Sequence, residues 1–181
     1  MKFRTVSSML LLALVALVAQ LALGVSARAE EKRPSVNAQR LEVLKSLAGE
    51  WVALDKDGKP TDTIVSSIRV TSAGSAVLET LFPGTDHEMV TLYHLDGADL
   101  ILTHYCMMGN QPRMRAEPGK DINTIVFKLI GGTNMKSTDD RHMHRATLVL
   151  EGKDRFKAEW VSCQDGKTCH QVRFDLVRKQ K

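Results

Sequence analysis

Short runs of strand-forming residues recur along most of this chain, roughly 8–12 residues apart, and turn signals separate them. The runs are Glu50–Leu54, Thr63–Thr71, Ser75–Phe82, Glu88–Leu95, Leu100–Cys106, Arg113–Glu117, Ile122–Ile130, His142–Glu151, Arg155–Cys163 and Thr168–Val177. The breaks carry pairs such as Asp57-Gly58, Asp96-Gly97 and Asp165-Gly166. No helical pattern separates the runs, which argues against a βαβ fold. We therefore predict an all-β fold, an antiparallel up-and-down β-barrel of about ten strands.

The first 29 residues have the pattern of a secretory signal peptide. Lys2 and Arg4 make a positive start, Met9–Leu23 is almost wholly apolar, and Ala27-Arg28-Ala29 is a small-x-small cleavage sequence. The apolar run has about 15 residues, fewer than the roughly 20 that a membrane-spanning helix needs. We expect cleavage near Ala29, no stable membrane insertion afterwards, and a secreted or periplasmic protein in an oxidising compartment.

Most of the chain's net positive charge lies in this leader segment. Residues 30–181 carry 22 basic and 21 acidic residues, so their net charge is +1 although the whole chain has a net charge of +4. Bulk charge therefore gives no reason to expect a nucleic-acid partner. Residues 30–36 are mostly polar and contain Pro34, which predicts a loose segment, and 37–181 suit a single barrel domain.

One short helix is predicted before the strands. Within Asn37–Leu47, the residues Leu41, Leu44 and Leu47 fall on one face, and Gly49 is a plausible stop. A short helix followed by Leu-Ala-Gly-Glu-Trp at 47–51 resembles the calycin-type β-barrels, which include lipocalins and fatty-acid-binding-like proteins. In that family a Gly-x-Trp in the first strand closes one barrel end, which implies a structural Trp51.

A second resemblance rests on four segments, Leu81–Thr85, Tyr93–Gly97, Thr103–Cys106 and Gly109–Met114. They are similar to segments of a group of small secreted bacterial proteins. The resemblance covers roughly residues 41–115, and it implies a fold rather than an activity.

The last three strands sort into an apolar and a polar face, and this sorting predicts their register. With Gly152–Asp154 as a three-residue loop, four pairs face one another across the first hairpin: Leu150 with Phe156, Leu148 with Ala158, Ala146 with Trp160, and His144 with Ser162. With Asp165–Lys167 as the next loop, Ser162 faces His170 and Cys163 faces Cys169.

This register predicts a disulfide between Cys163 and Cys169, because directly opposed strand positions lie within disulfide reach. The alternative is a redox or metal pair, although five residues separate these cysteines rather than two. Cys106 would then be the odd cysteine, a small buried hydrophobe.

The same register places His144, Ser162 and His170 in a row on the inward face. His104 shares a face with Leu100 and Leu102, which predicts that it also points inward. Arg113 would bind a ligand carboxylate if its face is inward, and would be a solvated surface residue if not. The predicted ligand-binding residues are His104, His144, His170, Ser162 and Arg113.

Two cofactor alternatives use the same histidines. His142, His144 and His170 would supply three nitrogen ligands, a set suited to zinc. An inward histidine would instead hold a haem iron, as in haem-binding calycin-like barrels. No sequence-adjacent carboxylate completes either site and aromatic residues make up only 5% of the chain, so a polar lining without a cofactor is the third reading.

The functional prediction is a secreted or periplasmic barrel that binds a small, partly polar ligand in its lumen. The rivals are a metal- or haem-binding barrel, enzymatic in one version, and a structural or interaction module with a filled core. The sequence lacks a Gly-x-Ser-x-Gly elbow, a phosphate-binding Gly loop and a His-Glu-x-x-His motif, so no catalytic residue is assigned. It carries no signal for an oligomeric state.

Overall fold

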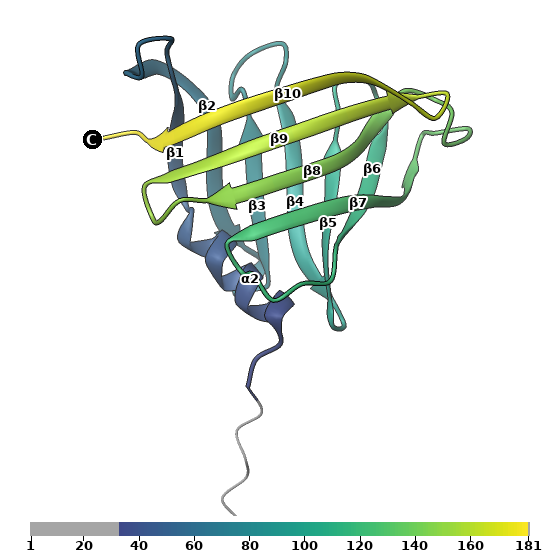
Figure 1. Cartoon of the computed structure of the whole chain (residues 1–181), viewed down its shortest axis with the longest axis horizontal. Helices are drawn as coiled ribbons and strands as arrows, with labels where there is room; N and C mark the ends of the chain where they lie inside the picture. The colour runs from purple at the N-terminus through teal and green to yellow at the C-terminus, as the bar shows by residue number, and fades with distance from the viewer. Residues whose placement is uncertain (1–32, 181) are drawn as a thin grey trace, which may run out of the picture. The chain divides into compact units, whose positions relative to one another are not determined.

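The computed structural model describes residues 33–180, which form ten strands, one α-helix and a short 3-10 turn at Ser72–Gly74. The strands are β1 (Gly49–Leu54), β2 (Pro60–Thr71), β3 (Ala76–Leu81), β4 (Met89–Asp96), β5 (Asp99–Tyr105), β6 (Gln111–Ala116), β7 (Thr124–Thr133), β8 (His142–Leu150), β9 (Arg155–Gln164) and β10 (Lys167–Arg178). Each strand pairs antiparallel with its sequence neighbours, and β1 pairs with β10, so the sheet closes into a barrel (Figure 1). The predicted fold class is confirmed. The predicted signal peptide lies outside the described residues.

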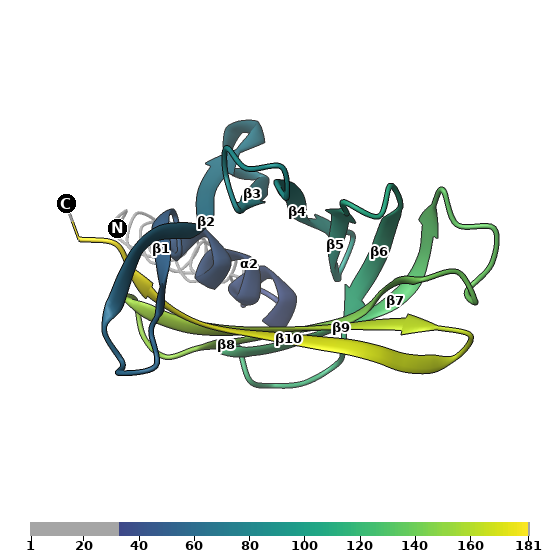
Figure 2. The same ribbon diagram turned by 90° about the horizontal axis from the view of Figure 1, so that it is seen from above.

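Helix α2 (Val36–Ser46) closes one end of the barrel, and Figure 2 shows it between the two barrel walls. It begins at Ser35, whose Oγ accepts a hydrogen bond from the backbone N–H of Ala38 at 3.1 Å. Leu41, Leu44 and Leu47 are buried, as their spacing predicts. Among residues 33–180, no helix is long and apolar enough to span a membrane.

Trp51 and Arg178 join the first and last strands at this closed end. They are paired across β1 and β10, and the Arg178 guanidinium lies 4.4 Å from the centre of the fully buried Trp51 ring. Phe156 packs edge-on against the same ring at 4.7 Å, and the indole N–H donates to the Leu47 carbonyl at 2.8 Å. The Trp51 indole is therefore held by β9, by β10 and by the end of α2.

The Arg178 side chain also donates hydrogen bonds to backbone carbonyl groups outside its own strand. Its guanidinium donates to the carbonyl oxygens of Ser46, Ala48 and Lys153, at 3.1, 2.8 and 2.7 Å. Gly49 makes room for it, because a Cβ at this position, where φ is +140°, would lie 2.6 Å from Arg178 Nη1. One cation thus connects the end of α2, the β8–β9 turn and β10.

We expect Arg178→Ala to lower the free energy of unfolding by about 2–4 kcal/mol, since it removes charge-assisted hydrogen bonds and a cation–π contact together. Urea unfolding followed by tryptophan fluorescence measures this change. Arg173→Ala is the matched control on β10, because that side chain is largely exposed and its one ion pair among the described residues is with Glu159. Its cost should stay below about 1 kcal/mol. Equal losses for the two variants would contradict the account of this end.

Candidate functional site

A cavity of about 390 Å³ opens among the strand ends far from α2. Most of its lining is apolar, and four of the chain's eight methionines contribute to it. The lining residues are Leu81, Phe82, Met89, His104, Cys106, Met107, Met108, Arg141, Met143, Trp160, Ser162, His170, Val172 and Phe174. An apolar cavity of this size with a few polar groups has the character of a small-molecule site.

His104 is the most buried polar group of the cavity, with only 1% of its surface exposed. Its ring packs against Trp160 with the ring centres 4.7 Å apart, and its Nδ1 lies 2.9 Å from the Thr91 hydroxyl. Its Nε2 has no hydrogen-bond partner. Burial lowers the pKa of the His104 imidazole to about 4, so the ring is neutral at physiological pH. The prediction that His104 points inward is confirmed.

A second buried polar cluster adjoins this histidine across the sheet. Glu79 is paired with Thr91, which is in turn paired with His104. The Glu79 carboxylate accepts hydrogen bonds from the Ser66 and Tyr93 hydroxyls, both at 2.7 Å. Burial raises the pKa of Glu79, against the lowering effect of these two donors. Neither Glu79 oxygen is hydrogen-bonded to Thr91, whose one side-chain partner among the described residues is His104.

The prediction that His144 faces Ser162 is wrong. The predicted pairs hold from Leu150 to Ala146, but the register then shifts and Met143 pairs with Ser162. The shift is a β-bulge, an irregularity of backbone hydrogen bonding that inserts one unpaired residue, and His144 is that residue. His144 instead lines a separate groove on the outer side of the sheet, and Met143 takes the place in the cavity.

The three histidines of the predicted zinc site do not come together. His142 is buried, and its Nε2 lies 3.3 Å from Nδ1 of His144. His170 lines the cavity, whereas neither His142 nor His144 is among the lining residues. Burial lowers the pKa of His144, and the neighbouring His142 and Lys128 add to this effect. Among the described side chains of residues 33–180, which do not include Cys169, no group of three or more His, Cys, Asp or Glu is placed to hold a metal ion. For the haem alternative, the cavity offers His104 and His170.

At the start of β10, one of the two predicted cross-strand pairs is present and the other is not. Ser162 pairs with His170 as expected, and both residues line the cavity. Cys163 pairs with Thr168 rather than with Cys169, because the register shifts between Thr168 and His170. Cys163 is buried and is not in a disulfide. The predicted disulfide between Cys163 and Cys169 is therefore not formed in this structure, and the Cys169 side chain itself lies outside the described residues.

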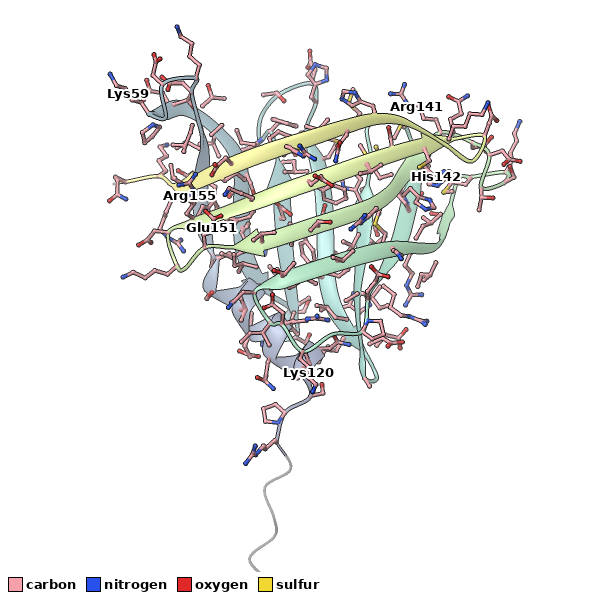
Figure 3. The ribbon with its side chains drawn as sticks, viewed as in Figure 1. Lys59, Lys120, Arg141, His142, Glu151 and Arg155 are labelled. Carbon is pink, nitrogen blue, oxygen red and sulfur yellow. The ribbon has the colours of Figure 1, made fainter. Side chains whose placement is uncertain are left out.

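Arg113 is not in the cavity. It points outward from β6 and pairs with Asp96 at 2.8 Å, which corresponds to the solvated reading of this residue. Arg141, just before β8, lines the cavity and has no ion pair or side-chain hydrogen bond with any residue in the described part of the chain. Figure 3 shows Arg141 beside His142 at one end of the barrel, with Lys120 at the other. No Asp or Glu among the described residues lines the cavity.

Sequence reasoning missed Arg141, Thr91 and the cavity methionines. The Thr91–His104 pair was within reach, because Asp96 pairs with Asp99 around a two-residue turn and that turn fixes the register of β4 and β5. Arg141 lies in a loop, where residue periodicity gives no direction for a side chain.

Comparison with known proteins adds nothing to the functional assignment, which therefore rests on the geometry of the site. No family model, no curated protein and no solved structure matches the chain.

The neutral state of His104 predicts a pH dependence of stability. Its pKa is about 4 in the folded protein and near 6.5 when unfolded, so its stabilising contribution is complete above pH 6.5. That contribution is lost as the pH falls towards 4, by about 3 kcal/mol in total. Urea unfolding of the wild type and of His104→Phe at several pH values isolates the effect. The two stability curves should converge or cross on acidification, and parallel curves would contradict the assignment.

Proposed function

We propose that this protein is a calycin-like, secreted or periplasmic binding protein, which holds a small molecule with an apolar body and an anionic group in the cavity. The observation that carries the proposal is the asymmetry between the barrel ends. The closed end is filled by α2 and by side chains such as Trp51 and Phe156, whereas the cavity lies at the opposite strand ends.

The composition of the lining argues for this class of ligand. Methionine side chains are flexible and polarisable, so they adapt to apolar ligands of varied shape. Met89, Met107, Met108 and Met143 come from three separate segments and surround the same space. A ligand with an apolar body gains free energy by leaving water there.

The charge of the lining argues for an anionic group. Arg141 is the one permanently charged side chain of the cavity, and its guanidinium has five N–H donors without a partner in the described structure. A carboxylate or sulfonate on the ligand would pair with it, in the bidentate geometry that arginine favours.

Filling the cavity should abolish binding. Val172 lines the cavity from β10, so Val172→Phe places a ring in the space that the ligand needs. We expect at least a tenfold loss of affinity for the neutral probe N-phenyl-naphthylamine, measured by its fluorescence. Val161→Phe is the matched control. Val161 lies on the neighbouring strand β9 and lines the outer groove instead of the cavity. Unchanged binding in Val172→Phe would place the ligand elsewhere and contradict the proposal.

The role of Arg141 is tested with two probes that share one aromatic framework, only one of which carries a sulfonate group. Anilinonaphthalene sulfonate carries an anionic group on the framework of N-phenyl-naphthylamine. Arg141→Gln should weaken the sulfonate roughly tenfold and leave the neutral probe unchanged, since it removes one charge-assisted hydrogen-bond donor group. Arg113→Gln, outside the cavity, should alter neither. Equal effects of Arg141→Gln on both probes would exclude an anion site at this residue.

A further inference from the structure

We infer that His104 presents an Nε2–H donor to the cavity and selects ligands that carry a hydrogen-bond acceptor, such as a carbonyl oxygen, at their buried end. Thr91 is the positioning residue that fixes this tautomer. The inference rests on the proposed function, because it names the chemical group that the same cavity recognises.

The argument begins with the Thr91 hydroxyl. Thr91 is completely buried, and its only hydrogen-bond partner among the described residues is His104 Nδ1, at 2.9 Å. A neutral imidazole carries one N–H, so Nδ1 either accepts from the hydroxyl or donates to it. If Nδ1 donated, the hydroxyl hydrogen would be left buried without an acceptor, a costly arrangement.

Glu79 is paired with Thr91 across β3 and β4, but no hydrogen bond joins its carboxylate to the Thr91 hydroxyl. Its two oxygens already accept from Ser66 and Tyr93. The Thr91 hydroxyl therefore donates to Nδ1, and the imidazole proton resides on Nε2.

The Nε2–H is then a donor without a partner. It belongs to a side chain that is 1% exposed and that lines the cavity beside Trp160. The Asn110 Oδ1 atom is also buried and unpartnered, but Asn110 does not line the cavity. The remaining hydroxyl of the lining, on Ser162, already donates to the His170 carbonyl at 3.3 Å. Two donors of the lining lack a protein partner among the described residues, the buried His104 Nε2–H and the exposed Arg141 guanidinium, and a ligand that carries acceptors satisfies both.

The tautomer itself is measured first, without any ligand. Long-range proton–nitrogen correlation NMR at neutral pH distinguishes a protonated from an unprotonated ring nitrogen. We expect Nε2 of His104 to carry the proton in the wild type and in Thr91→Ser, which keeps the hydroxyl. Thr91→Val should lose this preference. A wild-type His104 protonated at Nδ1 would overturn the inference.

Selectivity is measured with two naphthalenes of nearly equal shape, naphthyl methyl ketone and isopropenylnaphthalene, which differ in C=O against C=CH2. We expect the wild type and Thr91→Ser to prefer the ketone roughly tenfold, and Thr91→Val to prefer it about twofold or less. Equal binding of the two compounds by the wild type would overturn the inference and leave the proposed function standing. Binding of neither compound would overturn both.

Discussion

The contact between Trp51 and Arg178 is the interaction on which the rest of this barrel depends. Closing a sheet requires the first and last strands to meet in a fixed register, and these two residues are paired at that seam. Because the guanidinium also binds carbonyl groups at the end of α2 and in the β8–β9 turn, it positions the cap as well as the seam. The small Gly49 is a consequence of this arrangement.

A firmly closed end allows the other end to remain less filled. The core there gives way to flexible methionine side chains and to a polar layer that crosses β3, β4 and β5 through Glu79, Thr91 and His104. Each buried polar atom of this layer is bonded except His104 Nε2. Buried polar groups are normally satisfied, so this one exception next to a cavity is where a ligand atom is expected.

How much the sequence could predict depended on whether the backbone stayed regular. Strict alternation located all ten strands and the pairing from Leu150 to Ala146, because side-chain direction follows a period of two. The bulge at His144 inverts that direction for the residues before it, and no residue type in the segment announces it. Two assumed ligand histidines therefore lie away from the cavity, whereas His104 and His170, on strands with the expected direction at those positions, line it.

The location of the ligand is the central claim, and methyl NMR of the methionines tests it most directly. Met89, Met107, Met108 and Met143 line the cavity, whereas Met114 is fully buried and is not among the lining residues. On titration with decanoate, an apolar chain with a carboxylate, we expect the four cavity methyl signals to shift together and saturate, with Met114 little changed. Shifts confined to other methyl groups, or no saturable shift at all, would contradict the account.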